Sequence, residues 1–126
     1  MADALFRKKI LIIDDDAEIL EIAKTRLGAH GYKVFIANDG FEGLALARAQ
    51  MPDLILLDII MPKLDGFAVL AQLRASSHTS IVPVIMLTAK SESTSVMESQ
   101  TSGATDYFIK PCDWQELLRY IKRYLD

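Results

Sequence analysis

Five polar residues that could do chemistry stand where short apolar runs of this 126-residue chain end. They are Asp14 and Asp15 after the run 10–13, Asp58 after 54–57, Thr88 at the end of 82–88, and Lys110 at the end of 106–110. Short apolar runs bounded by turn residues are typical of strands buried in a parallel sheet. The carboxyl ends of such strands share one edge, where open α/β folds bind ligands, so we expect these side chains to meet.

Three carboxylates, one hydroxyl and one amine at one edge favour a magnesium and phosphate site. Two ionised carboxylates ~4 Å apart repel by ~4 kcal/mol at an effective dielectric of 20, so the cluster requires a cation or a retained proton. Oxygen ligands without His or Cys suit Mg²⁺, which leaves its other positions to water and phosphate oxygens. Aspartate is also a covalent phosphoryl acceptor, and Lys110 and Thr88 would help to position and neutralise a transferring phosphoryl group.

Strand and helix patterns alternate five times along the chain. The expected strands cover 10–13, 32–37, 54–58, 82–88 and 106–110, and the expected helices cover 17 to about 28, 41 to before Pro52, 66 to at least 73, 91–102 and 113–125. Alternating elements with short connections imply a parallel sheet covered on both faces and joined by right-handed crossovers. We therefore predict an α/β, doubly wound fold.

Apolar residues at helical spacing predict the first two helices. They are Ile19, Ile22, Ala23 and Leu27 in one helix, and Phe41, Leu44, Ala45 and Ala49 in the next. Asp16 is expected to be the N-cap of the first helix rather than a metal ligand, and Gly28 or Gly31 would end that helix. The segment 91–102 has seven Ser or Thr in twelve residues, so its helix should be the least stable of the five.

Composition indicates one globular domain over residues 1–126. The chain is 51% hydrophobic and 25% charged with a net charge of -3, which gives no basic field for nucleic acid. Its longest apolar run, 81–87, contains Pro83 and is far below the ~20 residues of a membrane span. The start carries no secretion signal pattern. A single cysteine, Cys112, can form no internal disulfide, in agreement with a reducing cytoplasm.

Five short motifs occur in a fixed order over nearly the whole chain. They are Ile10-Leu-Ile-Ile-Asp-Asp-Asp16, Leu57-Asp58-Ile-Ile-Met61-Pro62 with Asp65-Gly66, Leu87-Thr88-Ala89, Gly103-Ala104 and Tyr107-Phe-Ile-Lys110-Pro111. Together they resemble the receiver domain of two-component response regulators, of the chemotaxis-regulator type. The resemblance implies a flavodoxin-like fold with five strands in the order 2-1-3-4-5 and five helices.

The resemblance also implies a role for each residue of the cluster, with Asp58 as the phosphoacceptor. The metal ligands would be Asp14, Asp15, Asp58 and the backbone carbonyl of Ile60, the phosphoryl contacts Thr88 and Lys110, and the switch pair Thr88 and Tyr107. The side chains of Ile60 and Lys90 stand where receivers control the access of water to phosphorus. An apolar side chain and a long cation there predict a long-lived phosphoryl form.

Partners follow from the same resemblance. The phosphoryl donor would be a sensor histidine kinase or a histidine phosphotransfer protein, and the signal would leave through the face made by the predicted helix 91–102, the strand 106–110 and the last helix. This implies a cytoplasmic signalling protein, a monomer or a weak phosphorylation-dependent dimer, that binds a downstream protein but neither nucleic acid nor membrane. It would lose its phosphoryl group slowly without being a turnover enzyme. A single-domain regulator and a piece of a longer protein both remain open.

Two other classes share parts of the pattern. A haloacid-dehalogenase-like phosphatase also uses an Asp nucleophile with Mg²⁺, but it requires a second acid two residues on, where this chain has Ile60. A flavodoxin-like flavin carrier shares the fold, but the three acids after the first strand would repel its flavin phosphate. A persistent aspartyl phosphate is therefore the preferred interpretation.

Overall fold

The computed structural model describes residues 7–89, 103–110 and 113–125. Within them, five strands form one parallel sheet in the order β2-β1-β3-β4-β5. The strands are β1 (Lys9–Ile13), β2 (Lys33–Ala37), β3 (Leu54–Asp58), β4 (Val84–Ala89) and β5 (Asp106–Lys110), and the helices are α1 (Ala17–Ala29), α2 (Gly40–Gln50), α3 (Gly66–Ala75) and α5 (Trp114–Leu125). The predicted fold class and strand order are confirmed. The helix predicted over 91–102 lies outside the described residues.

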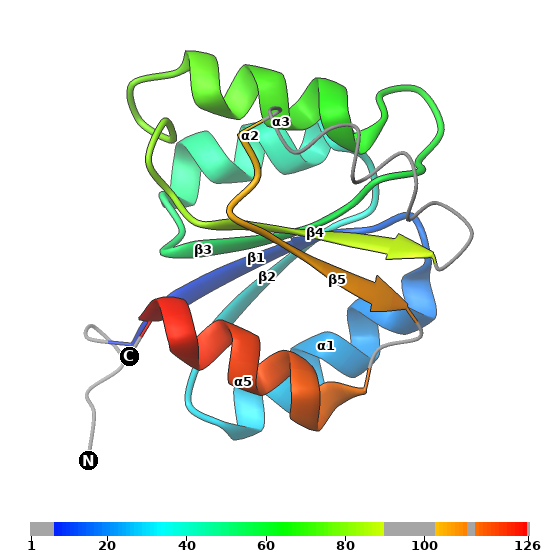
Figure 1. The fold of residues 1–126 in the computed structure, drawn as a ribbon, viewed down its shortest axis with the longest axis vertical. Coiled ribbons are helices and arrows are strands. Elements are labelled where there is room, and N and C mark those ends of the chain that lie inside the picture. Colours follow the sequence, from blue (N-terminus) through cyan, green and yellow to red (C-terminus); the bar gives the residue numbers. More distant parts are fainter. Residues whose placement is uncertain (1–6, 90–102, 111–112, 126) are drawn as a thin grey trace.

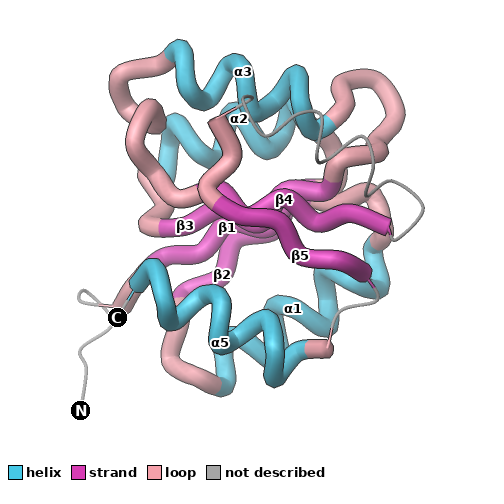
Figure 2. Tube along the Cα trace, in the orientation of Figure 1, coloured by secondary structure: helices cyan, strands magenta, loops and turns pink. Residues whose placement is uncertain are grey.

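The sheet is the middle of three layers, with α2 and α3 on one face and α1 and α5 on the other (Figure 1). Figure 2 shows the same arrangement by element type. Because side chains alternate along a strand, Leu11 and Ile13 enter the core beneath α2 and α3, whereas Ile10 and Ile12 enter the core beneath α1 and α5. β3 is buried at every residue, which confirms the strand predicted from its unbroken apolar run.

The faces predicted for the first two helices are partly wrong. α1 buries Leu20, Ala23 and Leu27, while Ile22 is 36% exposed. α2 buries Gly43 and Ala47, while Phe41 is 58% exposed. Apolar spacing alone does not show which of two adjacent helix faces is buried. Here the buried faces carry small residues, because these let the helix backbone come close to the sheet. A Cβ on Gly43 would lie 2.4 Å from the Ile13 Cδ1 atom, so α2 sits against β1 through its smallest side chains.

Two strands begin later than predicted. Val82 and Pro83 precede β4, which starts at Val84; the proline has no N–H to donate, although its carbonyl accepts from the Ile55 N–H at 2.9 Å. Tyr32 precedes β2 because its N–H is bound to the Leu27 carbonyl at the end of α1. No helix in the part of the chain that the structure describes is both long and apolar enough to cross a membrane.

The four helices that the structure describes begin at the edge where the strands end, and an aspartate side chain accepts backbone N–H groups at the start of each; at α5 this is Asp113, which accepts from Gln115 and Glu116. Asp16 accepts from the backbone N–H groups of Glu18 and Ile19, Asp39 accepts from Glu42, and Asp65 accepts from Ala68. This satisfies N–H groups that have no partner inside the helix. The prediction that Asp16 is an N-cap is confirmed. Gly31, with φ +91° after the C-cap residue of α1, takes the conformation expected of a helix stop.

Candidate functional site

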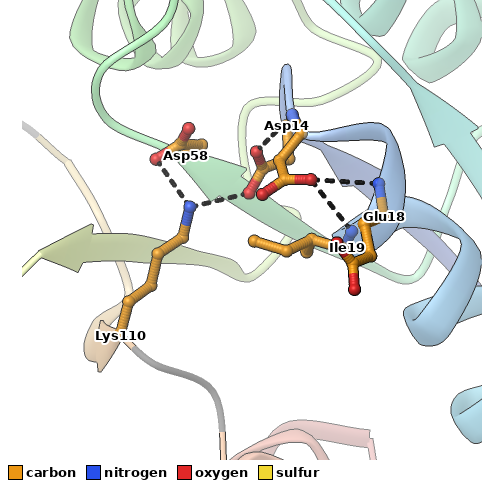
Figure 3. A network of polar contacts seen from close by, with 6 residues as sticks. Asp14, Glu18, Ile19, Asp58 and Lys110 are labelled. Atoms are coloured by element: carbon orange, nitrogen blue, oxygen red, sulfur yellow. Dashed lines mark hydrogen bonds and ion pairs between the residues drawn. The ribbon is translucent and has the colours of Figure 1, made fainter.

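The ammonium group of Lys110 joins two carboxylates at the carboxyl edge of the sheet. Its Nζ atom lies 2.9 Å from Asp14 Oδ2 and 3.3 Å from Asp58 Oδ1, and Figure 3 shows it directed between them. Asp14 follows β1, Asp58 ends β3 and Lys110 ends β5. Residues 96 positions apart in the sequence therefore meet because parallel strands end on the same side.

Both carboxylates are held in place and largely removed from solvent. Asp14 is fully buried and Asp58 is 6% exposed. The second oxygen of Asp14 accepts from the backbone N–H of Asp16 at 2.9 Å, so both of its oxygens are engaged. Asp58 stands in β3, which β1 and β4 flank on either side. Both carboxylates of the cluster are therefore supplied by buried central strands of the sheet.

The electrostatics of the cluster favour an additional positive charge. Burial, together with the charge of Asp14, raises the pKa of Asp58 from 3.8 to about 7, although Lys110 acts in the opposite direction. For Lys110, burial alone would lower the pKa, but the hydrogen bond and charge of Asp14, followed by the charge of Asp58, raise it above its usual value. Lys110 is thus a permanent cation, and it does not fully offset the two carboxylates.

A third carboxylate completes a set that could hold a metal ion. Asp14, Asp15 and Asp58 each offer one oxygen, and these oxygens all lie within 4.8 Å of one another. Asp15 is exposed whereas the other two are buried, so the set opens toward solvent on one side. Hard oxygen ligands with an open side fit a divalent cation that keeps some of its waters.

The loop after Asp58 is compact and tied back to β3. Ile59 and Met61 are buried, and between them the Ile60 side chain is 61% exposed. The Gly66 N–H donates to the Ile59 carbonyl at 2.7 Å. A Cβ on Gly66 would lie 2.3 Å from the backbone carbonyl oxygen of Asp58, so only glycine lets α3 start so close to the backbone at the end of β3.

The comparisons with known proteins agree over almost the whole chain. A family model described as the response regulator receiver domain matches residues 10–122. The structure of CheY4, a chemotaxis response regulator of Vibrio cholerae, superposes with a TM-score of 0.87 at 32% identity, covering 94% of this chain and 98% of that one. This chain belongs to the response regulator receiver family. The phosphatase and flavin-carrier alternatives are not favoured.

Curated relatives of this receiver domain differ in length. The protein PilH of Pseudomonas aeruginosa is 40% identical over 93% of this chain and 97% of its own length. The DNA-binding dual master transcriptional regulator RpaA of Synechocystis is 44% identical over 93% of this chain but only 48% of its own length. The chain thus spans about half the length of several curated relatives that it matches.

The remaining residues singled out from the sequence lie near the cluster or beyond the described ranges. Thr88 is buried, and its hydroxyl donates to the Ala89 carbonyl at 3.2 Å; Ala89 is in turn the register partner of Lys110. Tyr107 is half-buried and packs against the core beneath α2 and α3. Lys90, the segment 91–102 and Cys112 lie outside the described residues.

Sequence reasoning missed how the Asp65-Gly66 pair works. The helix predicted from residue 66 does begin at Gly66, but the sequence pattern gives no reason for a glycine at that position. In the structure Asp65 caps α3 and Gly66 is its first residue, while the positive φ of the loop belongs to Lys63, at +70°. A glycine directly after an N-cap aspartate, eight residues beyond a strand-end aspartate, is the signal that could have indicated close packing instead.

Proposed function

We propose that residues 1–126 act as one phosphoacceptor domain, with Asp58 as the residue that accepts the phosphoryl group. An oxygen of the Asp58 carboxylate would form a bond to phosphorus while the bond from phosphorus to the donor's leaving atom breaks, and that electron pair leaves with the donor. The observation that carries the proposal is the bridging of Asp14 and Asp58 by the Lys110 ammonium. It puts a buried nucleophile beside a fixed cation that can neutralise phosphoryl oxygens.

The three carboxylates would hold Mg²⁺, together with the backbone carbonyl of Ile60. When bound, the ion would neutralise charge on the phosphoryl oxygens and favour the ionised form of Asp58. The chain's own part is to supply oxygens at short range: Asp14 is oriented by the Asp16 N–H and Lys110, and Asp15 lies exposed beside it. Support comes from the raised pKa of Asp58, which is caused by burial and then by the charge of Asp14, since a bound dication would favour the ionised carboxylate against both.

Thr88 and Tyr107 would carry the change away from the site. Thr88 is in β4, which pairs with the strand of Asp58, and Tyr107 is in β5, on the far side of β4. Thr88 would turn its hydroxyl toward the new phosphoryl dianion, and Tyr107 would repack in the space that this frees. The output face would include β5 and α5, where Arg119 and Arg123 are largely exposed although they pair with Glu116 and Asp106.

The donor would be a sensor histidine kinase or a histidine phosphotransfer protein in the cytoplasm, and the downstream partner a protein that distinguishes two states of β5 and α5. The domain would pass a signal rather than turn over substrate. Membership of the receiver family supports this class of donor. Whether the domain works as a monomer or as a phosphorylation-dependent dimer would be measured by sedimentation with and without a phosphoryl donor.

The test of the site is phosphorylation by acetyl phosphate, followed by intact mass and peptide mapping. We expect one phosphoryl group on Asp58 in the presence of Mg²⁺ and none after chelation. Asp58→Asn should abolish labelling because an amide is not a nucleophile here. Asp15→Asn should weaken the metal site, so that labelling requires a higher Mg²⁺ concentration. Asp16→Asn is the matched control, since it changes an adjacent carboxylate that caps α1 and Asn caps helices equally well. Labelling of Asp58→Asn at the parent level would overturn the proposal.

A further inference from the structure

Charged side chains are segregated along the direction of the strands. Because the sheet is parallel, each described helix begins at the carboxyl edge and runs back to the amino edge. Acidic residues occupy the first turns of α1, α2 and α5, and basic residues occupy the last turns of all four described helices. Charges of this sign favour the helix dipole. Together with Asp14 and Asp58 at the strand ends and Lys9 and Lys33 at the strand starts, they make one edge acidic and the other basic.

Each edge also exposes two large apolar side chains. At the carboxyl edge, Phe41 and Ile60 are more than half exposed; at the amino edge, Met51 is more than half exposed and Ile81 is 92% exposed. All four belong to α2, to its C-cap or to the loops on either side of α3. Single exposed apolar side chains are ordinary, but these form two pairs at opposite ends of the same part of the molecule.

The apolar pair at the amino edge lines a hollow of about 240 Å³. Its other walls are Pro52, Asp53, His78, Val82 and Pro83. A cavity of ~150 Å³ can hold a benzene ring, so the hollow has room for an aromatic side chain. Among the exposed large apolar side chains of the described residues, the one aromatic is Phe41, at the opposite edge.

Opposite charges stand beside the two apolar pairs. Arg48 is exposed in the last turn of α2, three residues before Met51, and Glu42 is exposed in the first turn, directly after Phe41. Neither charged side chain forms an ion pair within the described ranges. If the end of α2 in one copy faces the start of α2 in another, Arg48 meets Glu42 and the two helix dipoles align head to tail. Two like edges would repel each other instead.

We propose that the amino edge of one copy of this chain binds the carboxyl edge of a second copy. Met51 and Ile81 of the first copy would pack against Phe41 and Ile60 of the second, with opposite charges around them. The two contacting surfaces differ, so the contact is heterologous and can repeat from copy to copy. This inference goes beyond the proposed function and does not depend on which residue accepts a phosphoryl group.

The test is sedimentation velocity over a range of protein concentrations up to about 1 mM. We expect the sedimentation coefficient of the parent to rise with concentration, and to rise less at high salt because salt screens the charges. Arg48→Glu makes both edges acidic and Glu42→Arg makes both basic, so each variant alone should associate at least about tenfold more weakly. An equal mixture of the two should associate again, because every acidic edge then finds a basic one.

Two further variants separate this contact from a general effect. Lys24→Glu reverses an exposed charge in α1 on the other face of the sheet and should associate like the parent. Ile81→Ser removes an apolar side chain that is almost fully exposed; it should weaken association about tenfold and leave urea unfolding unchanged.

Three outcomes would overturn the inference. The first is a parent that stays monomeric at every concentration. The second is an equal mixture of Arg48→Glu and Glu42→Arg that associates no better than either variant alone. The third is association that Ile81→Ser abolishes but Glu42→Arg leaves intact, which would indicate a contact between the amino edges of two copies. Urea unfolding of each variant shows that the measured protein is folded.

Discussion

The two edges of the sheet hold charged side chains in opposite surroundings. At the carboxyl edge, Asp14 and Asp58 face each other across Lys110, and the pKa of Asp58 is raised to about 7. At the amino edge, the guanidinium of Arg74 in the last turn of α3 is surrounded by neutral acceptors. They are the carbonyl oxygens of Gly103, Thr79, Ser80 and Val82 and the hydroxyl of Thr105, at 2.8 to 3.5 Å.

The Arg74 contacts show what a purely structural charge looks like in this fold. Arg74 has no ion pair with a carboxylate in the residues that the structure describes, and burial lowers its pKa. The N–H groups of its guanidinium nevertheless donate to carbonyls of the loop before β4 and to the carbonyl of Gly103 before β5. At the amino edge the charge is satisfied by hydrogen bonds, whereas at the carboxyl edge two carboxylates repel each other, and a proton or a bound cation would relieve that repulsion.

Removing the amino-edge cation should have the largest effect on stability. Arg74→Met would leave the carbonyls of the loop between α3 and β4, and that of Gly103, without this donor, and we expect a loss of about 3 kcal/mol in the free energy of unfolding. Arg74→Lys should recover only part, because an ammonium lacks the planar fork. The control is Arg48→Met, which removes the arginine in the last turn of α2 and should cost no more than about 1 kcal/mol. Urea unfolding measures all three; equal losses at the two arginines would contradict the comparison.

At the carboxyl edge, the charge of Asp58 should make the stability of the protein depend on pH. The pKa of Asp58 is higher in the folded protein than its ordinary 3.8, so the folded state binds the additional proton. Stability of the metal-free protein should therefore fall as pH rises from about 4 to about 7 and stay low above that. Asp58→Asn should remove this slope and stabilise the metal-free protein by about 2 kcal/mol at alkaline pH, less than the shift alone implies because Lys110 loses a partner.

Urea unfolding with chelator, on both sides of this pH range, measures the effect. Asp16→Asn serves as the control because Asp16 caps α1 and lies outside the ion pairs of Lys110. An Asp58→Asn variant that is less stable than the parent above pH 7 would contradict this prediction. It would show that the attraction between Lys110 and Asp58 stabilises the fold more than the repulsion between Asp14 and Asp58 destabilises it.

The features that the sequence predicted correctly are those set by the pattern of side chains along the chain. An unbroken apolar run identified β3, and the parallel topology alone was enough to expect Asp14, Asp58 and Lys110 at one edge. The exposed side chains of Ile22 and Phe41 show where spacing is insufficient, since two helix faces fit the same pattern and close packing chooses between them.

Other features leave no side-chain pattern at all. The acceptors of Arg74 are mostly backbone carbonyls, which every residue has, so nothing in the sequence distinguishes this arginine from Arg48. The positive φ at Lys63 is imposed by packing on both sides of the loop, against the local preference for glycine. Such backbone features follow only from the assembled fold.

The exposed apolar side chain at the carboxyl edge should affect the lifetime of the phosphoryl group. Ile60 is 61% exposed beside Asp58 and cannot orient a water molecule. Ile60→Asn supplies an amide that can, and we expect dephosphorylation to become up to about tenfold faster, typical of one positioned polar group. The rate would be followed after removal of acetyl phosphate, with Ile60→Val as the control that keeps the site apolar. A slower or unchanged Ile60→Asn would contradict this role.

The smallest effect is expected at Met51, the counterpart of Lys63 at the amino edge. Met51 ends α2 with φ 50° and is 58% exposed, and its N–H bonds to the Ala47 carbonyl. Glycine is the residue that this helix-end conformation favours, so Met51→Gly should stabilise the protein by about 0.5 kcal/mol, the relief of strain being partly offset by greater freedom of the unfolded chain. Because Met51 lies at the opposite end of the sheet from Asp58, Mg²⁺ affinity should stay at the parent value. Urea unfolding and an NMR titration of backbone amide shifts with Mg²⁺ measure both quantities on the same samples. Weaker Mg²⁺ binding in Met51→Gly would mean that a change at the amino edge reaches the carboxyl edge, and the contrast between the two edges would then fail.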